Sequence, residues 1–236
     1  MIELDNITHY YGKNSALENV SLVIEAGKTV SVLGSSGSGK TTLLRLIAGL
    51  ETPREGTIRI NGKVVTAGSE ILVPPYRRGA GFIFQDLALW PHFTIYRNVA
   101  FGLEERKEAN VKEKVTEILD FLKLGEHAQK YPHQLSGGQK QLAAIARALV
   151  LRPQILLMDE PLANLDVKLK KQLLLYIKEL KRKFGLTIVY VTHEHKEAFE
   201  LADKIVIINN GKIEDEGSPE EIKNSENEYV KYFLEY

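Results

Sequence analysis

Short runs of apolar, mostly β-branched residues recur along the chain and predict strands that are buried on both faces. The clearest runs are residues 29–33, 155–158, 187–191 and 204–208. Between them, apolar residues spaced three and four apart predict amphipathic helices, of which residues 166–184 form the clearest. Strands that alternate with such helices indicate an α/β fold with a mostly parallel sheet.

Residues that favour helix ends lie where these patterns begin and stop. Gly185 follows the helix predicted at 166–184 and is typical of a C-cap. Near the C-terminus, Ser218, Pro219 and Glu221 have the order of an N-cap, a first helical proline and a glutamate that reaches back. The sequence therefore predicts a short capped helix there.

Two other regions have different patterns. Turn residues at 11–14, 25–28 and 61–62 separate short strands, which predicts a small antiparallel sheet beside the core. Residues 86–152 are mostly helical in pattern, with turns near 123–125 and 131–132. We therefore expect one domain over 1–236, with an α/β core and antiparallel sheet in 1–85 and 153–236 and an inserted helical subdomain at 86–152.

Composition narrows the classes of function. The chain has 31 Lys and Arg against 31 Asp and Glu, and this zero net charge argues against a nucleic-acid partner. The absence of cysteine excludes disulfides, thiol nucleophiles and Cys-ligated metals. The N-terminal residues have no signal-peptide pattern, and no apolar run approaches the roughly 20 residues that span a bilayer. If the protein works at a membrane, we expect other chains to bring it there.

A glycine-rich segment at 34–42 joins a predicted strand to a predicted helix and fits the pattern G-x-x-x-x-G-K-[ST]. Such a loop turns backbone N–H groups toward phosphates, and the helix N-terminus adds partial positive charge. A Gly/Ser linker would lack this strand–loop–helix setting. Lys40 is expected at the β- and γ-phosphates of a nucleotide and the Thr41 hydroxyl at Mg²⁺. The remaining residues expected to bind the nucleotide are Ser35, Ser36, Gly37, Ser38, Gly39 and Thr42.

Two carboxylates follow the apolar run at 155–158. Asp159 is expected to hold Mg²⁺ through its water shell. Side chains alternate along a strand, so Glu160 is expected to point differently and to polarise the water that attacks the γ-phosphate. The alternative, an ordinary polar turn, is disfavoured by the phosphate loop that precedes it.

The sequence Leu-Ser-Gly-Gly-Gln at 135–139 resembles the signature of ATP-binding-cassette (ABC) ATPases, and the order of motifs resembles that family over nearly the whole chain. It opens a helix predicted at 139–151, so its amides form a second anion site. The resemblance implies a P-loop ATPase fold, with ATP and Mg²⁺ bound between two chains. Residues Ser136, Gly137, Gly138 and Gln139 of one chain would face the ATP in the phosphate loop of the other.

The same resemblance gives roles to further residues. Tyr11 would stack on adenine, with Tyr10 as the rival candidate. Gln85 would contact Mg²⁺ and the attacking water, and His193 would contact the γ-phosphate. Asp166 ends the D-loop, 162–166, and is also expected to cap the next helix.

Some positions depart from common patterns. Asn164 is unusual within the D-loop, and Leu142 stands where many relatives carry Arg. The sequence His193-Glu194-His195 could suggest a zinc pair, but it lacks the second histidine of H-E-x-x-H.

Residues 85–103, which contain the single tryptophan, Trp90, resemble the version found in importers for sugars, polyamines, iron and oxyanions. In that group the stretch lines a groove for the permease, although Trp90 and Phe93 could instead fill the core of the helical subdomain. The resemblance implies an importer ATPase at the cytoplasmic face of the membrane. It would work as a homodimer or with a similar ATPase, on two transmembrane permease subunits and, indirectly, an extracytoplasmic substrate-binding protein.

Two alternatives stay open at this point. One is the ATPase of an exporter or lipid-releasing complex, and the other is a soluble ABC ATPase of DNA repair, translation or cluster assembly. Many importer ATPases of this group continue into a regulatory domain. Because the sequence ends at Tyr236, we expect no control through such a domain.

Overall fold

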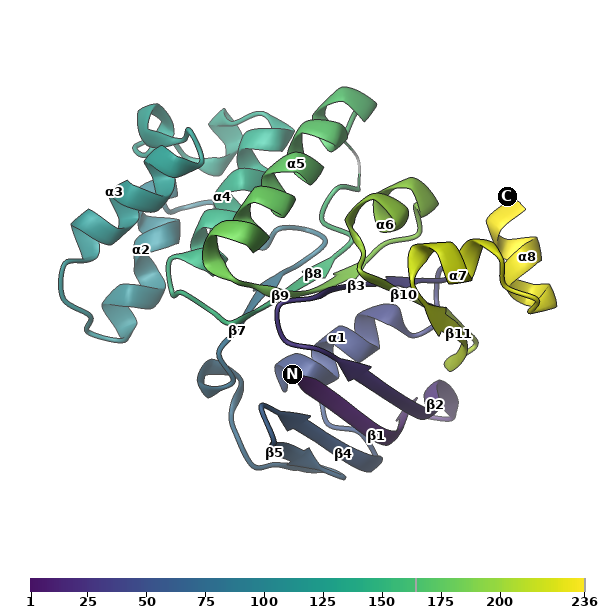
Figure 1. Cartoon of the computed structure of the whole chain (residues 1–236). Coiled ribbons are helices and arrows are strands. Elements are labelled where there is room, and N and C mark those ends of the chain that lie inside the picture. Colours follow the sequence, from purple (N-terminus) through teal and green to yellow (C-terminus); the bar gives the residue numbers. More distant parts are fainter. Residues whose placement is uncertain (164, 236) are drawn as a thin grey trace.

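A computed structural model describes residues 1–163 and 165–235. Two sheets lie one above the other, with helix α1 (Lys40–Ala48) between them and further helices on the outer face of the upper sheet (Figure 1). This arrangement agrees with the P-loop fold that the sequence resemblance implies.

In the described part of the chain, the central sheet has six strands in the order β11-β10-β3-β9-β8-β7. From β10 to β7 neighbouring strands are parallel, and β11 pairs antiparallel with β10. The strands are β11 (Lys212–Gly217), β10 (Lys204–Asn209), β3 (Thr29–Leu33), β9 (Thr187–Val191), β8 (Ile155–Asp159) and β7 (Ala80–Ile83). The four predicted strands are the four adjacent inner ones, β10, β3, β9 and β8. Their burial on both faces explains their unbroken apolar sequences.

The predicted antiparallel sheet is confirmed, with the order β2-β1-β4-β5-β6. Its strands are β1 (Ile2–Tyr11), β2 (Asn14–Ile24), β4 (Glu55–Ile60), β5 (Lys63–Ala67) and β6 (Glu70–Ile71). The β4–β5 turn holds Asn61 at φ 51° and Gly62 at φ 77°, the left-handed pair that a tight hairpin requires. Helix α1 (Lys40–Ala48) lies between the two sheets (Figure 1), and its Leu43 and Leu44 are fully buried.

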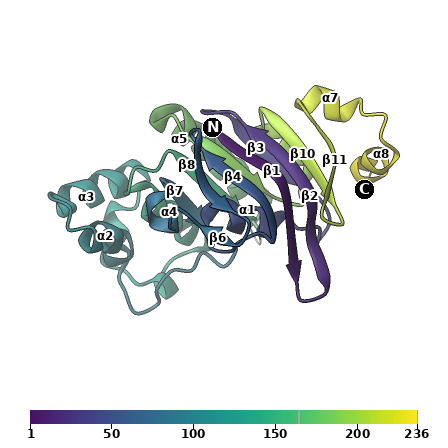
Figure 2. The ribbon, with the colours of Figure 1, turned by 90° about the horizontal axis from the view of Figure 1, so that it is seen from below.

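Helices α5 (Val167–Phe184) and α6 (His195–Leu201) cover the outer face of the central sheet. The described residues of 86–152 contain helices and no strand. These helices are α2 (Ile95–Glu105), α3 (Val111–Phe121) and α4 (Gly137–Leu149), with short 3-10 helices at Gly125–His127 and Pro132–Gln134. They lie at one end of the molecule (Figure 2), opposite α7 (Pro219–Lys223) and α8 (Glu228–Glu235).

Residues of 86–152 do not enclose a core of their own. Leu119 of α3 and Ile145 of α4 belong to the same buried apolar cluster as Leu156 of β8 and Leu173 of α5. A separate subdomain at 86–152 therefore stays a prediction, since one continuous cluster spans its boundaries.

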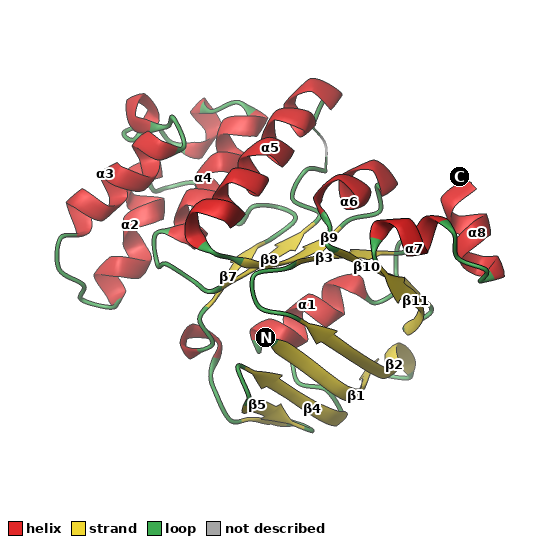
Figure 3. Cartoon of the chain, viewed as in Figure 1, coloured by secondary structure: helices red, strands yellow, loops and turns green. Residues whose placement is uncertain are grey.

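The predicted caps lie where the local sequence placed them, at both ends of α5 and at the start of α7. Figure 3 shows both helices between their flanking loops. Asp166 accepts a hydrogen bond from Leu169 N at 3.0 Å at the start of α5, and Gly185 ends that helix at φ 62°. Ser218 and Glu221 form the capping box of α7. Among the described residues, no helix combines the length and apolar character that a membrane span requires.

The helix predicted at 139–151 is shifted by two residues, because α4 runs from Gly137 to Leu149. Ser136 is its N-cap: Ser136 Oγ accepts from Gln139 N at 3.3 Å, and Gln139 Oε1 accepts from Ser136 N at 3.0 Å. This reciprocal pair satisfies the N–H groups of Ser136 and Gln139, and it starts the helix directly after Ser136.

Candidate functional site

An open cleft of about 660 Å³ lies beside the phosphate loop, near the carboxyl ends of β3 and β8. From the loop and the start of α1 it is lined by Ser36, Gly37, Gly39, Lys40, Thr41 and Thr42. Segments far away in the sequence add Tyr11, Gln85, Glu160 and His193. Gln85, Glu160 and His193 follow the parallel strands β7, β8 and β9, whose carboxyl ends meet at one edge of the central sheet. Tyr11 comes instead from the end of β1 in the antiparallel sheet.

The phosphate loop needs glycine at particular positions. Gly37 has φ 79° with open space where a Cβ would stand, and Gly39 has φ 106°. A Cβ on Gly39 would lie 2.3 Å from Ala16 O, so no other residue fits this close approach. Ser35 and Ser38, which were also expected at the nucleotide, are not among the residues that line the cleft, and Ser38 is 3% exposed.

The Lys40 ammonium group lies at the floor of the loop. Its Nζ donates to the carbonyl oxygens of Gly34 and Ser35, each at 2.8 Å. Burial lowers the pKa of Lys40, although the charges of Glu160 and Asp159 oppose that shift. The loop thus holds a partly desolvated cation at the N-terminus of α1, an electrostatic setting that favours phosphate.

Asp159 is the last residue of β8 and is 4% exposed. Its Oδ1 accepts from Thr41 Oγ1 at 2.9 Å. Burial raises the pKa of Asp159, although the hydrogen bond from Thr41 opposes the shift. The Asp159 carboxylate and the Thr41 hydroxyl therefore bring two oxygen atoms together, one from the end of β8 and one from the start of α1.

Glu160 does point differently from Asp159, but strand alternation is the wrong explanation. The strand ends at Asp159, and Glu160 has a left-handed φ of 43°. Its N–H donates to Val191 O of the neighbouring strand at 2.9 Å. This unusual backbone brings Glu160 Oε2 to 3.1 Å from His193 Nδ1. Strained non-glycine residues of this kind cluster at functional sites.

Of the two aromatic candidates at the end of β1, Tyr11 lines the cleft and Tyr10 does not. Tyr11 Oη donates to the carboxylate of Glu51, which also pairs with Arg45 Nη1 at 3.1 Å. Burial raises the pKa of Tyr11, and the hydrogen bond to Glu51 raises it further. Sequence reasoning missed the hairpin residues that follow and line the same wall. These residues are Asn14, Ser15 and Ala16. The signal that could have found them is their position directly after Tyr11 and the turn that follows it.

Gln85 lies just after β7 at the mouth of the cleft. In the loop that follows, Leu87 and Ala88 have left-handed φ angles of 62° and 45°. Arg147 of α4 donates to Leu87 O at 2.8 Å and also to Ala88 O. Sequence reasoning missed this arginine, which joins the loop after Gln85 to the helix that Ser136 opens.

The signature residues Ser136, Gly137, Gly138 and Gln139 open α4 and are not among the residues that line the cleft of their own chain. A Cβ on Gly138 would lie 2.7 Å from the Leu169 side chain of α5. In the D-loop, Asp166 caps α5, and Asn164 lies outside the described residues.

Trp90 belongs to a half-buried aromatic cluster. Its ring lies 4.7 Å from the ring of Phe101 and 5.7 Å from that of Phe93, and Arg147 stacks over it at 5.1 Å. The buried Asn98 side chain accepts from Trp90 N at 2.9 Å and donates to Trp90 O at 3.1 Å. The rings both pack against the helices and reach the surface. This intermediate burial is consistent with either alternative, a permease groove or a local core.

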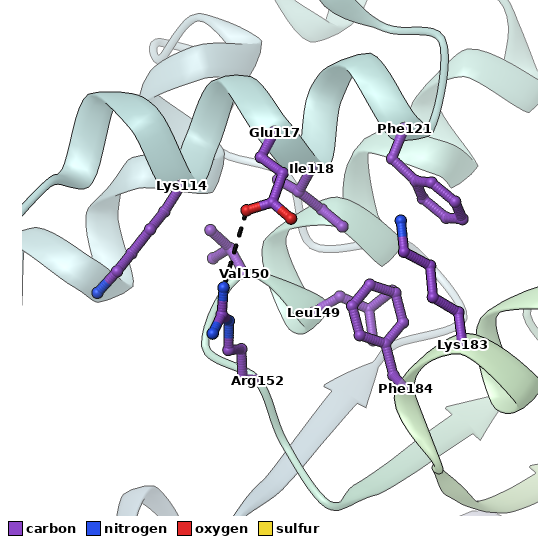
Figure 4. Close-up of a pocket in the computed structure, with 9 residues that line it drawn as sticks. All are labelled: Lys114, Glu117, Ile118, Phe121, Leu149, Val150, Arg152, Lys183 and Phe184. Atoms are coloured by element: carbon purple, nitrogen blue, oxygen red, sulfur yellow. Dashed lines mark ion pairs between the residues drawn. The ribbon is translucent and has the colours of Figure 1, made fainter.

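A second cavity, between α3 and the ends of α4 and α5, is of another kind (Figure 4). Lys183 Nζ lies 3.5 Å from the centroid of the Phe121 ring there. The volume of this second cavity is about 30 Å³, the space of roughly one water molecule, so a nucleotide does not fit.

The pattern of the ABC transporter family matches residues 17–163. The sulfate/thiosulfate import ATP-binding protein CysA of Pseudomonas syringae pv. tomato is 46% identical over 99% of this chain and 72% of its own length. The spermidine/putrescine import ATP-binding protein PotA of Thermobifida fusca is 45% identical over 94% of this chain and 58% of its own length. The chain thus spans only part of the length of these relatives, 72% of the first and 58% of the second.

Solved structures resemble the fold closely. The dimeric structure of MJ0796, a bacterial ABC transporter cassette, has a TM-score of 0.83, with 35% identity over 93% of this chain and 99% of that one. A post-hydrolysis state of MJ0796 bound to ADP and Pi has a TM-score of 0.82, with 34% identity over 93% of this chain and 99% of that one. From the phosphate loop, the strand-end carboxylates and these relationships, we conclude that the chain belongs to the ABC transporter family and is an ATP-binding cassette ATPase.

Proposed function

We propose that this chain is the ATP-hydrolysing subunit of an ABC importer. The observation that carries the proposal is the 46% identity, over 99% of the chain, to a protein named as an import ATP-binding protein. Relatives named for sulfate and for polyamines match almost equally well, at 46% and 45% identity. The proposal is therefore uptake of a small solute, with the solute selected by the permease and its binding protein.

Mg²⁺ is the proposed metal, held by Thr41 and, through water, Asp159, with Gln85 reaching it from the same cleft. The support is the donor chemistry: Thr41 Oγ1 and Asp159 Oδ1 lie 2.9 Å apart, and Mg²⁺ prefers such oxygen ligands. When bound, Mg²⁺ would neutralise charge on the phosphate oxygens. The loop amides and Lys40 would hold the same oxygens from the other side.

Glu160 is the proposed base for hydrolysis. Its carboxylate lies in the cleft and 3.1 Å from His193 Nδ1, so each side chain orients the other. Glu160 would accept the proton of the attacking water while His193 contacts the γ-phosphate. Catalysis would then come mainly from positioning and charge stabilisation, as in other phosphoryl transfers.

Two ATPase chains are proposed to close around two nucleotides. The second chain would be either another copy of this chain or a similar ATPase. The cleft of one chain lacks Ser136–Gln139 of that chain among its lining residues, which supports a site completed by a second copy. The first turn of α4 offers backbone amides to phosphate in the same way as the first turn of α1.

The proposed location is the cytoplasmic face of the membrane, bound peripherally to two transmembrane permease subunits. An extracytoplasmic binding protein would deliver the solute to them. The permease would sit against the half-buried cluster of Trp90, Phe93 and Phe101, beside the loop that follows Gln85. The rings of this cluster reach the surface beside Arg97 and Arg147, and apolar surface bordered by polar groups is typical of a partner site.

The proposal is tested by tagging the chain in its own cell and purifying it from detergent-extracted membranes. Two integral membrane proteins should co-purify, and vesicles that contain the complex should take up a solute only with its binding protein and internal ATP. Recovery without membrane proteins would favour a soluble ABC ATPase. ATP-dependent movement in the outward direction would favour an exporter.

A further inference from the structure

Glu197 of α6 is a buried carboxylate outside the nucleotide cleft. It is 4% exposed, and its Oε2 accepts from Tyr190 Oη at 2.7 Å and from Thr192 Oγ1 at 2.9 Å. Its Oε1 lies 3.2 Å from Lys170 Nζ of α5. Burying a carboxylate costs several kcal/mol unless it is paired and hydrogen-bonded, so these three donors are what stabilise it here.

Lys170 joins this carboxylate to a second one. Its ammonium group also pairs with Glu194, and its side chain is 14% exposed. Burial disfavours its charge, but the hydrogen bond that it donates to Glu194 and the charge of Glu197 outweigh burial and raise the pKa of Lys170. Lys170 therefore stays charged at neutral pH, and its contact with Glu197 joins α5 to α6.

The loop between β9 and α6 is fixed by this group on both sides of His193. Thr192 Oγ1 donates to Glu197 and accepts from Glu194 N at 3.0 Å. The Glu194 side chain is held by Lys170. The residues before and after His193 are thus both anchored, directly or through one intermediate, to the same buried carboxylate.

His193 has little packing of its own to fix it. Its side chain is 55% exposed, and its Nδ1 lies 3.1 Å from Glu160 Oε2. Its place at the cleft is therefore set by the backbone that carries it. A displacement of about 1 Å at such a group can cost as much as roughly 100-fold in rate.

We propose that Glu197 is a positioning residue for ATP hydrolysis, acting through His193 by anchoring Thr192 and, through Lys170, Glu194. The inference rests on the proposed function of His193 at the γ-phosphate. Glu197 does not line the cleft, so it acts on turnover and leaves nucleotide binding unchanged.

The test compares Glu197→Gln with Glu200→Gln. Glu200 is a matched control, since it lies on the same helix and pairs with a lysine of α5, Lys178, at 3.1 Å, but its side chain is 39% exposed. In Glu197→Gln the amide replaces the charge that faces Lys170. We expect kcat to fall about 10-fold, with KM for ATP and ADP affinity within about twofold of the parent. Glu200→Gln should keep the parental kcat.

A double-mutant cycle separates positioning from general destabilisation. His193→Ala alone should lower kcat strongly, and adding Glu197→Gln to it should change kcat by less than about twofold, because the histidine to be positioned is gone. Equal fold-losses in both backgrounds would overturn the inference. Parental kcat in Glu197→Gln alone would also overturn it. Parental kcat in His193→Ala would instead refute the proposed role of His193.

Thr192→Val provides the same cycle if Glu197→Gln does not fold. Valine keeps the shape of threonine and removes only the hydroxyl that connects Glu197 with Glu194 N. The same loss of kcat is expected, again absent when His193 is alanine. A thermal melt of each variant shows whether the loss of kcat accompanies a loss of stability. A loss of kcat without a lower Tm would be due to the displaced His193.

Discussion

Arg78 is a buried cation that, among the described residues, hydrogen-bonds to carbonyl and hydroxyl oxygens and to no carboxylate. Replacing it should destabilise the fold measurably. It is 4% exposed, and burial lowers its pKa to about 10. Its guanidinium group donates to five acceptors: Leu46 O, Ile47 O, Val65 O, Val73 O and Thr66 Oγ1. It thereby ties the end of α1 to strand β5, and so holds the helix of the phosphate loop on the antiparallel sheet.

The size of the effect follows from which acceptors lose their donor in Arg78→Met. Leu46 O keeps Gly49 N at 3.1 Å, and Val65 O keeps Leu72 N at 3.0 Å. The other three lose the arginine donor; they are Ile47 O, Val73 O and Thr66 Oγ1. An unsatisfied buried group costs about 1–3 kcal/mol. The lower end applies because Arg78 borders a cleft of about 450 Å³ that admits water. The expected loss is about 3–4.5 kcal/mol, or on the order of 10 °C in Tm.

Urea titration followed by circular dichroism measures this loss, with Arg182→Met as the control at an exposed arginine of α5. The control should stay within about 0.5 kcal/mol of the parent. The loss of stability in Arg78→Lys should lie between those of Arg78→Met and Arg182→Met, since one ammonium group cannot reach all the acceptors that the planar guanidinium group spans. A loss below about 1 kcal/mol in Arg78→Met would refute the reasoning.

Four further outcomes are expected. Glu160→Gln should keep ATP binding and lower kcat by at least about 100-fold, accumulating closed dimers on ATP; a near-parental rate would refute the assignment of the base. Ser136→Arg should leave ATP binding by the single chain intact and stop turnover, whereas loss of binding would contradict a site completed in trans. Because the pKa of folded Asp159 is raised above 3.8, its charge destabilises the fold above that raised pKa. Asp159→Asn should therefore raise the urea midpoint at pH 7, and the gain should vanish as the pH falls to about 3.9; a gain independent of pH would contradict this sign. Asn98→Ala should shift the emission of Trp90, the single tryptophan, to longer wavelength by freeing its loop, and an unchanged spectrum would show that the aromatic rings alone hold it.

Much of the site was predictable because many of its residues lie close together in the sequence. The glycines of the phosphate loop, the strand that precedes it and the helix that follows are neighbours in the chain. The same holds for the capped start of α4, where Ser136 and Gln139 bond to each other. Local patterns of this kind fix backbone geometry within a few residues, so the sequence predicts them without knowledge of distant partners.

Other features came from contacts that no local pattern encodes. The strained turn at Glu160 depends on Val191 O, which is adjacent only because β8 and β9 pair in the sheet. The predicted start of α4 was late because the cap, and not the periodicity, decides where a helix begins.

The sequence by itself therefore determined the strands buried on both faces, the caps and the two glycine-rich helix starts, since each depends on spacing within a short segment. Only the tertiary structure decided that Tyr11 and not Tyr10 lines the cleft, that Arg147 holds the loop after Gln85, and that Glu197 anchors the loop of His193. Those contacts join residues brought together by strand order and helix packing. Their energies come from burial and pairing, which are properties of the assembled chain.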